Sequence, residues 1–467
     1  MAVDNLSAAS NITIQERRDA AGLDAYVPII LCDGAPYDTH LDRFFLDLPL
    51  SGVRSRHSLR AYGYDVLIWL RFLAEACGRS VWQADRQDVL AYHRARRRKD
   101  AEQRISAASW NRSVACLDRL YRWAAQEGLT AEVPFTHRTV WRRGYGGRRA
   151  HMAARNNAYE QAARPSGVNF VTLDDYRLFR DVGLRGLLPG GLERPGARDR
   201  NGMRNSIFAE LLVTTGLRLE EASFLLACEL SALNSHAASD RQAWLKLPDA
   251  LTKGNRGRNV LVPRRLLEQI QAYVTVERAA AVAKFQQRFG WKTIEKPIFV
   301  IGRQSGPRLT LRDGSAIALD RLRPEERSRT VFCDDDGAQQ PAVLWLTEVG
   351  QPLQPNSWEV IFARASQRCA AAGSAIRISP HQLRHTFAVH MLAMLIQHRL
   401  RQAALPAASM EGYRQLLGDP LQQVQRLLGH ANLTTTYIYL DHIATRADTV
   451  DAAVEELLAL LPSARSL

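Results

Sequence analysis

Apolar side chains recur at three- and four-residue spacing between residues 55 and 128, and this period constrains the fold of the chain's first third. Such a period places one apolar stripe along an α-helix. The first helix is predicted by a stripe of Leu59, Tyr62, Val66, Trp69, Leu70 and Leu73. The same reasoning predicts helices over 86–98 and 107–127, with Gly128 just past the end of the last. We expect a small helical domain over residues 36–137, after an N-terminal extension over residues 1–35.

Residues 138–167 break this pattern, because seven arginines lie among four glycines there. Glycine and charge mixed in this way are typical of a flexible connector. The connector is either a solvated linker or a cationic segment that follows a phosphate backbone. The sequence leaves both interpretations open.

A second domain is predicted over residues 168–445. Alternating residues over 243–262 surround a Gly-flanked turn, which predicts a short β-hairpin. Residues 290–356 are rich in Pro, Gly, Asp and Arg, and we interpret them as an insertion with short strands. A tail over 446–467 carries an apolar helical stripe that needs a partner, either its own domain or a neighbouring subunit. Further helices are predicted over 172–182, 202–215, 219–227, 264–289, 357–372, 380–400, 411–418, 421–428 and 433–440.

The charge balance favours a polyanionic partner. The formal net charge is +14, and only six of the 62 basic residues are Lys. Arginine binds phosphate bidentately, although a GC-rich genome also enriches Arg. We expect nucleic acid rather than an anionic membrane surface. The chain opens without a signal peptide, lacks a long apolar run and has no CxxC pair among its six cysteines, which predicts a cytoplasmic protein with reduced thiols.

Two upstream positions suit phosphate chemistry. Arg218 follows Gly216 at a junction between two predicted helices, where an arginine beside backbone N–H groups suits an anion. An Arg followed by Glu is, however, commonly a surface ion pair. Lys253 lies in the Gly-flanked turn of the hairpin, from which its ammonium can reach a leaving oxygen as a general acid. A lysine in a turn is otherwise simply solvated.

A C-terminal helix start adds two further candidates. Pro380 suits the first position of this helix, so His381 and Arg384 share one face at its positive end. His381 and His385 are four apart and could instead ligate a metal, as in HExxH sites. Gln382 occupies the position of the glutamate and no third ligand is apparent, so we expect no metal and a packing role for His385.

The last candidates come from the segment Leu428-Gly429-His430, which ends a short helix. The next predicted helix carries Tyr437 and Tyr439. Tyrosines two apart on a helix face different directions, so at most one of them points at the Arg/His cluster. Periodicity alone does not decide between them.

These motifs resemble the tyrosine recombinase (phage integrase) family. The resemblance is carried by TGLRLEE over 215–221, HQLRH over 381–385 and LLGHANLTTTYIY over 427–439, within residues 50–135 and 168–445. It implies that Tyr439, nine residues after His430, is the nucleophile and that Glu221 supports Arg218. The implied catalytic set is Arg218, Lys253, His381, Arg384, His430 and Tyr439. Two intervals are long for this family, because of the insertion over 290–356 and the region 399–413.

The resemblance also implies an architecture and a chemistry. We expect a mainly α fold with a small antiparallel β-sheet, in which a core-DNA-binding domain and an integrase-like catalytic domain form a C-shaped clamp on DNA. The implied activity is site-specific recombination for a mobile element, by integration or transposition, through a 3′-phosphotyrosyl intermediate without cofactor. Double-stranded DNA and a homo-tetramer, with or without other recombinase subunits, are the expected partners. The expected DNA-binding residues are Arg96, Arg97, Arg98, Arg142, Arg143, Arg148, Arg149 and Arg256.

Other functions fit the same motifs. One alternative is a non-catalytic DNA-binding accessory protein on the same fold, and the intact set of candidate catalytic residues argues against it. A type IB topoisomerase shares the chemistry but needs no sequence-specific pairing of sites. A telomere resolvase would instead form hairpin ends.

Overall fold

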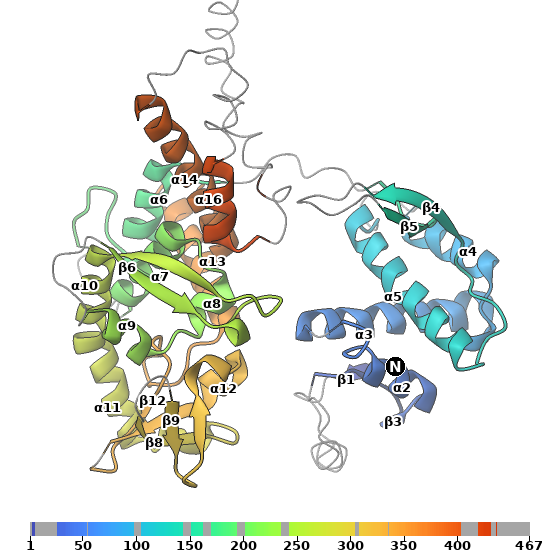
Figure 1. Ribbon diagram of the computed structural model, residues 1–467, viewed down its shortest axis with the longest axis horizontal. Coiled ribbons are helices and arrows are strands. Elements are labelled where there is room, and N and C mark those ends of the chain that lie inside the picture. The colour runs from blue at the N-terminus through green and yellow to red at the C-terminus, as the bar shows by residue number, and fades with distance from the viewer. Residues whose placement is uncertain are drawn as a thin grey trace, which may run out of the picture. The chain divides into compact units, whose positions relative to one another are not determined.

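The computed structural model describes residues 2–4, 26–53, 55–97, 104–142, 151–161, 170–193, 201–234, 242–303, 308–334, 336–402, 419–430 and 436. The chain divides into two compact units, Met1–Ser166 and Gly167–Leu467 (Figure 1). The expected C-shaped clamp stays a prediction. Within the described ranges, no helix is both long and apolar enough to cross a membrane.

The described residues of the first unit include four α-helices, and the three predicted helices are confirmed. These are α3 (Arg56–Phe72), α4 (Arg86–Arg97) and α5 (Ala107–Gln126), preceded by α2 (Thr39–Asp47). A three-stranded sheet of β1 (Ala2–Asp4), β2 (Ile29–Cys32) and β3 (Ala35–Pro36) completes the unit's beginning. The core is aromatic: Trp69 Nε1 donates to the Tyr121 hydroxyl at 2.8 Å, and that hydroxyl donates to the Val81 carbonyl at 2.8 Å.

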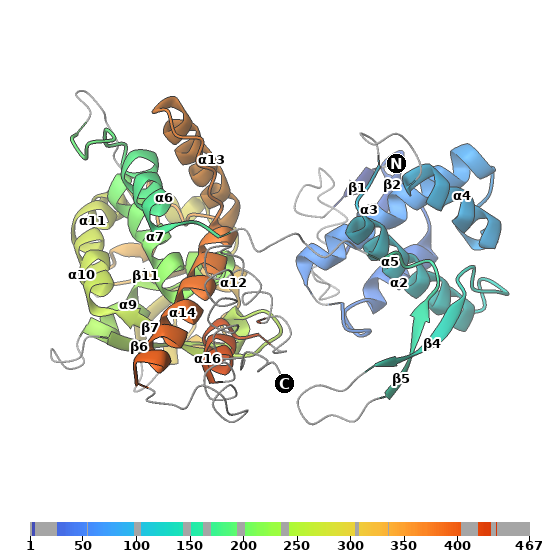
Figure 2. The ribbon, with the colours of Figure 1, turned by 90° about the horizontal axis from the view of Figure 1, so that it is seen from above.

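Part of the expected connector over 138–167 is regular structure, which corrects our interpretation of this whole segment as a flexible connector. Strand β4 (His137–Arg142) pairs antiparallel with β5 (His151–Asn156). Thr139, Val140 and Trp141 are residue types that favour strands, and this local preference outweighs the surrounding arginines and glycines. Figure 2 shows the two strands projecting from the helices of the first unit.

The second unit is also mainly helical. Its first half contains α6 (Leu173–Leu178), α7 (Gly202–Thr215), α8 (Leu219–Ser223), α9 (Ala227–Asn234), α10 (Arg264–Tyr273) and α11 (Ala279–Gln287). The helix predicted over 219–227 is therefore two helices. The second half contains α13 (Pro355–Ala371), α14 (Pro380–Gln402) and α16 (Asp419–Leu428). Phe208 of α7 stacks on Trp358 of α13, with ring centroids 3.6 Å apart, and fixes the centre of the core.

The hairpin predicted over 243–262 is confirmed. Strand β6 (Gln242–Leu247) pairs antiparallel with β7 (Arg258–Pro263), and the turn between them contains Lys253. Along β7 the side chains of Val260 and Val262 are buried, which follows the two-residue period of a strand with one face on the core.

The insertion over 290–356 forms a sheet of its own. Its strands are β8 (Ile298–Arg303), β9 (Arg308–Leu311), β10 (Ala316–Ala318), β11 (Thr330–Cys333) and β12 (Gln339–Pro341), in the order β10-β9-β8-β11-β12. Strands β8 and β11 run parallel, so this sheet is mixed, whereas β6 and β7 form the small antiparallel sheet that was expected. The crossover that makes them parallel includes α12 (Pro324–Arg329).

Two buried arginines attach this insertion to the helices. Arg327 of α12 pairs with Glu229 of α9 at 2.9 Å. Arg278 donates from Nη2 to the carbonyls of Pro341 and Val343, at 2.6 and 3.2 Å. Buried guanidinium groups with several acceptors of this kind hold an inserted segment in one position.

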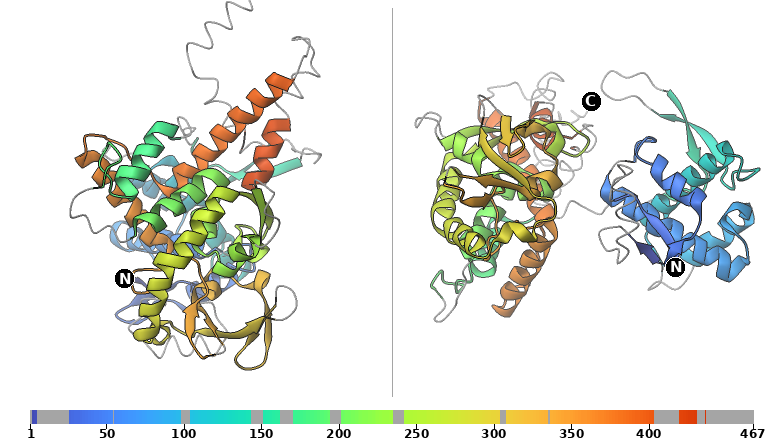
Figure 3. Two further views of the ribbon diagram at one scale, coloured as in Figure 1. Left: turned by 90° about the vertical axis from the view of Figure 1, so that its left-hand side faces the viewer. Right: turned by 90° about the horizontal axis from the view of Figure 1, so that it is seen from below.

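Helices α14 and α16 pack side by side, as Figures 1 and 3 show. Phe387, Leu392, Val424 and Leu428 form a buried apolar cluster at their contact. This contact brings the start of α14 and the end of α16 to the same region of the second unit. The candidate site is built there.

Candidate active site

The junction between α7 and α8 positions Arg218. Helix α7 ends at Thr215 and is capped by Gly216, whose φ of +66° lies in the left-handed region that favours glycine. A Cβ at this position would lie 2.4 Å from Cδ1 of Phe387, so the close contact of α7 with α14 also requires glycine. Arg218 then stands at the N-cap of α8, where its backbone N–H donates to Glu221 Oε2 at 2.8 Å.

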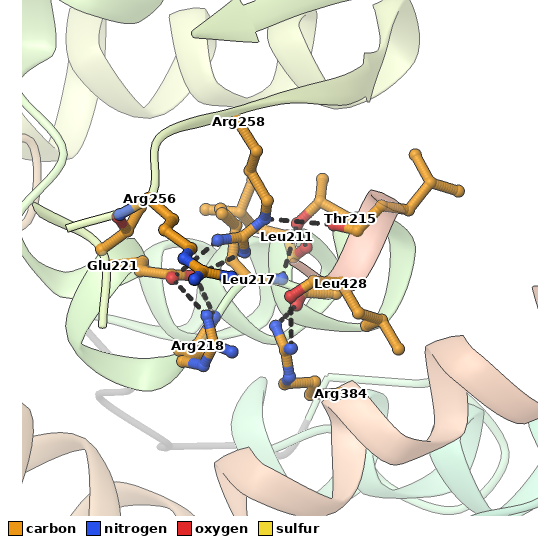
Figure 4. A network of polar contacts seen from close by, with 12 residues as sticks. Leu211, Thr215, Leu217, Arg218, Glu221, Arg256, Arg258, Arg384 and Leu428 are labelled. Carbon is orange, nitrogen blue, oxygen red and sulfur yellow. Dashed lines mark hydrogen bonds and ion pairs between the residues drawn. The ribbon is translucent and has the colours of Figure 1, made fainter. Parts of the chain in front are cut away.

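Glu221 is a buried carboxylate held between two arginines. Its side chain is 1% exposed, and Arg218 Nη1 lies 2.8 Å from Oε1. Arg258 binds the same carboxylate in a bidentate manner, with Nη1 and Nη2 at 2.8 and 2.6 Å (Figure 4). Burial by itself raises the pKa of Glu221, but the hydrogen bond from Arg258 and the two guanidinium charges lower that pKa to about 2. Glu221 therefore stays ionised and orients both arginines.

Arg384 joins three segments of the chain. It lies on the first turns of α14 and is 3% exposed. Its Nη1 donates to the Gly216 carbonyl, and its Nη2 donates to the Leu428 carbonyl at 2.6 Å (Figure 4). Both acceptors are neutral, so these hydrogen bonds hold the guanidinium in place without cancelling its charge. Arg384 thereby fixes the residues just before Arg218 and just before His430 relative to each other.

His381 and His385 lie one turn apart on α14, with their rings edge to face and their centroids 4.5 Å apart. Partial burial, together with the positive charges of Arg384, Arg218 and Lys253, lowers the pKa of His381. His381 is therefore neutral near pH 7. In the described part of the chain, no three His, Cys, Asp or Glu side chains form a cluster that suits a metal ion.

His430 follows a tight turn at the end of α16. Gly429 has a φ of +64°, and a Cβ there would lie 2.9 Å from Cδ of Arg258. Nδ1 of His430 lies 3.0 Å from the hydroxyl of buried Thr436. Burial, and then the charges of Arg384 and Arg218, lower the pKa of His430 to about 4. The imidazole is thus a neutral group beside two cations.

Lys253 and Arg256 are exposed in the turn between β6 and β7. A hydrogen bond within the turn stabilises it, because the Arg256 N–H donates to Thr252 Oγ1 at 2.9 Å. Lys253 lies close enough to the cluster for its charge to lower the pKa of His381. Arg218, Lys253, His381, Arg384 and His430 therefore surround one positively charged region.

Other expected site residues have different positions. Arg97 was expected to bind DNA, but its guanidinium is bound within the first unit. Its Nε donates to Glu160 at 2.7 Å and its Nη1 donates to the Ile105 carbonyl. The reason is that the segment after β5 returns Glu160 to α4. Arg96, also on α4, is half-buried and lies near Tyr92. The side chain of Arg142 is not described, and Arg98, Arg143, Arg148, Arg149, Tyr437 and Tyr439 lie outside the described residues.

Two known family descriptions match this chain. The phage integrase N-terminal SAM-like domain matches residues 41–128, and the phage integrase family matches residues 194–411. The chain belongs to the tyrosine recombinase, or phage integrase, family. It is thereby a member of the enzyme class that cleaves and rejoins DNA strands. The second match ends before His430 and Tyr439.

Individual tyrosine recombinases are distant relatives. XerD of Mycobacterium tuberculosis is 24% identical over 389 residues, which cover 82% of this chain and 86% of XerD. XerC of Shewanella oneidensis is 33% identical over 114 residues, covering 24% of this chain and 27% of XerC. The XerH site-specific recombinase bound to its palindromic difH substrate has a TM-score of 0.47 at 14% identity, covering 86% of this chain and 81% of that one. A lambda integrase dimer bound to a COC′ core site has a TM-score of 0.44 at 13% identity, covering 87% and 77%.

Sequence reasoning missed two residues that organise this recombinase site. Arg258 binds Glu221 and, through Nε, the Leu427 carbonyl at 3.1 Å, so it connects the hairpin to α8 and α16. A signal for it existed: Arg258 is in phase with Val260 and Val262 on the buried face of β7. Thr436 left no such signal, because no local sequence pattern indicates its contact with His430.

Proposed function

We propose that this tyrosine recombinase is a site-specific DNA recombinase that uses Tyr439 as its nucleophile. The observation that carries the proposal is the bridge made by Arg384, whose two carbonyl bonds bring Arg218, His381 and His430 around one cationic region. A region of this charge, with neutral imidazoles at its edge, suits a phosphodiester. Tyr439 follows Thr436 by three residues, and Thr436 is tied to His430.

The proposed reaction needs no external energy source. The Tyr439 oxygen attacks the scissile phosphorus and the bond from phosphorus to the 5′-oxygen breaks, which leaves a 3′-phosphotyrosyl bond and a 5′-hydroxyl. The phosphoester bond is conserved, so the reverse attack by a 5′-hydroxyl rejoins the strand. Arg218 and Arg384 bind the two non-bridging oxygens while negative charge develops.

Proton transfers complete the step. Lys253 donates a proton to the leaving 5′-oxygen, and neutral His381 accepts the proton of the tyrosine hydroxyl. For His430 we assign the tautomer in which Nδ1 accepts from the Thr436 hydroxyl and Nε2–H donates to the phosphate. Its low pKa keeps this tautomer available across the neutral range. All proton donors and acceptors proposed for this step are side chains of the protein.

The biological setting is a second proposal, more specific than the reaction itself. We infer integration or transposition of a mobile element, on double-stranded DNA in the cytoplasm, by an assembly of several recombinase subunits. The resemblance to phage integrases supports this setting. Sequencing of joined DNA from cells expressing the protein tests it: new junctions at two defined sites support it, and their absence contradicts it.

The nucleophile is tested with a pool of nicked duplexes, which trap the covalent intermediate when the short strand diffuses away. Wild-type protein is expected to form a complex with DNA that survives denaturation in detergent. Tyr439→Phe abolishes this complex and retains DNA binding, and the neighbouring Tyr437→Phe is the matched control. Undiminished adduct in Tyr439→Phe contradicts the proposal, and binding without any adduct in the wild type favours a non-catalytic accessory protein.

A further inference from the structure

The strand pair β4–β5, which we call the arginine ribbon (residues 137–142 and 151–156), is firmly anchored at one end. His137 lies 3.0 Å from Asp118 of α5, and Asn156 opposite it is 3% exposed. Just beyond the strands, Trp110 Nε1 donates to the Ala158 carbonyl at 2.8 Å. The base of the ribbon is therefore part of the first unit's core.

The other end of the ribbon is uncovered. Trp141 and Met152 face each other across the two strands and are 72% and 59% exposed. Figures 2 and 3 show the strands extending beyond the helices of their unit. An isolated two-stranded ribbon has only marginal stability of its own. A ribbon with an anchored base and exposed side chains at its far end therefore suits contact with a partner outside the unit.

The charges on the ribbon specify what it contacts. Residues 137–156 contain six arginines and no Asp or Glu. Arg138 and Arg155 are directly opposite each other, on the face away from Trp141. Like charges opposite one another destabilise a strand pair, and among the described residues no carboxylate forms an ion pair with either of them. A bound polyanion would remove this repulsion.

We propose that the arginine ribbon is a DNA-binding arm in which Arg138 and Arg155 contact phosphates of the duplex. This inference rests on the proposed function for the identity of the polyanion. A two-stranded ribbon is narrow enough to enter the major groove, which is about 12 Å wide. The ribbon then adds a grip on DNA that is separate from the catalytic cluster.

Salt dependence of DNA binding tests the proposal. The full chain carrying Tyr439→Phe is titrated onto a labelled linear duplex of arbitrary sequence at several salt concentrations. Each neutralised phosphate contributes about 0.9 to the slope of log K against log salt. Arg138→Gln with Arg155→Gln is expected to lower that slope by about 2, whereas the double Lys variant keeps it because the charges remain. Thermal melting of the Gln variant is expected at or above the wild-type temperature, since the like-charge pair is gone.

A charge-matched control uses two exposed arginines on helices of the same unit. Arg43 is paired with Glu127, and Arg60 lies over the ring of Tyr64. Arg43→Gln with Arg60→Gln is expected to leave the slope near its wild-type value. An unchanged slope in the ribbon variant, or an equal loss in the control, overturns the proposal. The proposal is also overturned if the ribbon variant no longer binds phosphatidylserine vesicles while its DNA binding stays intact. That result would assign the ribbon to a membrane surface.

The two proposals fail separately. Binding to the duplex is measured without cleavage, and the adduct experiment is measured without ribbon variants. A wild-type protein that binds DNA through the ribbon but forms no adduct contradicts only the catalytic proposal. Adduct formation by the wild type, together with an unchanged salt slope in the ribbon variant, contradicts only the ribbon proposal.

Discussion

Glu221 shows how a single buried charge organises this site. Its carboxylate accepts hydrogen bonds from Arg218 and Arg258, and its side chain is 1% exposed. Arg218 remains 27% exposed, so its guanidinium extends from the buried carboxylate toward solvent. At the scale of residues, Glu221 thus orients Arg218, which we propose binds the phosphate.

Replacing Glu221 by Gln is expected to destabilise the protein strongly. Two guanidinium groups lose their common counter-charge, and breaking a buried pair in this way costs about 3 kcal/mol or more. Chemical denaturation measures the loss. Asp174→Asn is the surface control, because Asp174 is 89% exposed in its pair with Arg177 and such pairs contribute about 0–1 kcal/mol. Equal effects of the two substitutions would contradict this role of Glu221.

Arg258 is expected to act as a positioning residue. Arg258→Lys retains the charge but loses the bidentate grip on Glu221, so Arg218 shifts. We expect the rate of adduct formation to fall about a hundredfold, with DNA affinity little changed. Single-turnover cleavage and equilibrium binding separate these two effects. A parallel loss of affinity and rate would instead indicate that Arg258 itself holds DNA.

The low pKa of His430 predicts a pH dependence of stability. This pKa is about 4 in the folded protein against an ordinary 6.5, so the unfolded chain binds more protons between these values. Stability is therefore fully present above pH 6.5 and falls as the pH drops through this window. His430→Asn should flatten this part of the curve of unfolding free energy against pH. A curve parallel to that of the wild type would show that another group controls it.

At the scale of elements, the site depends on helix ends that meet. Helix α7 ends at Thr215, just before Gly216, α14 begins at Pro380 and α16 ends at Leu428. Arg384 links all three through backbone carbonyls. Carbonyls near a helix C-terminus lack partners within the helix, so they are natural acceptors for this arginine.

Gly216→Ala is expected to disrupt this meeting of helices. The added Cβ requires a left-handed alanine and also meets Phe387 Cδ1 at 2.4 Å. Gly254→Ala provides the matched control, because Gly254 has a φ of +81° with no atom within 4 Å of the added Cβ. The control carries only the backbone cost of about 1 kcal/mol, and overpacking adds about 1–3 kcal/mol at Gly216. Equal melting temperatures for the two variants would contradict the packing argument.

At the scale of the whole molecule, the chain consists of two units with separate cores. The first core is built from residues between Val27 and Phe135, and the second from residues between Val171 and Leu383. A net charge of +14 spread over such a chain favours encounter with a long polyanion by electrostatic steering.

Because its core is self-contained, the first unit is expected to fold when residues 1–166 are expressed alone. Cooperative thermal unfolding with a near-ultraviolet circular dichroism signal from its packed tryptophans would be the expected result. The fragment carries the arginine ribbon and its anchors, so it should also bind duplex DNA. A fragment that lacks a cooperative transition would show that the first core needs the second unit.

Local patterns in the sequence determined the helices, the hairpin around Lys253 and the motif residues Arg218, His381, Arg384 and His430, because period and capping act within a few residues. The strand character of the arginine ribbon was also local, but the arginines and glycines concealed it. Only the tertiary structure decided that Arg258 shares Glu221 with Arg218, that Arg384 bridges Gly216 and Leu428, and that Arg97 pairs with Glu160. These contacts join residues far apart in the chain, and their geometry follows from how the helices pack rather than from any neighbouring residue.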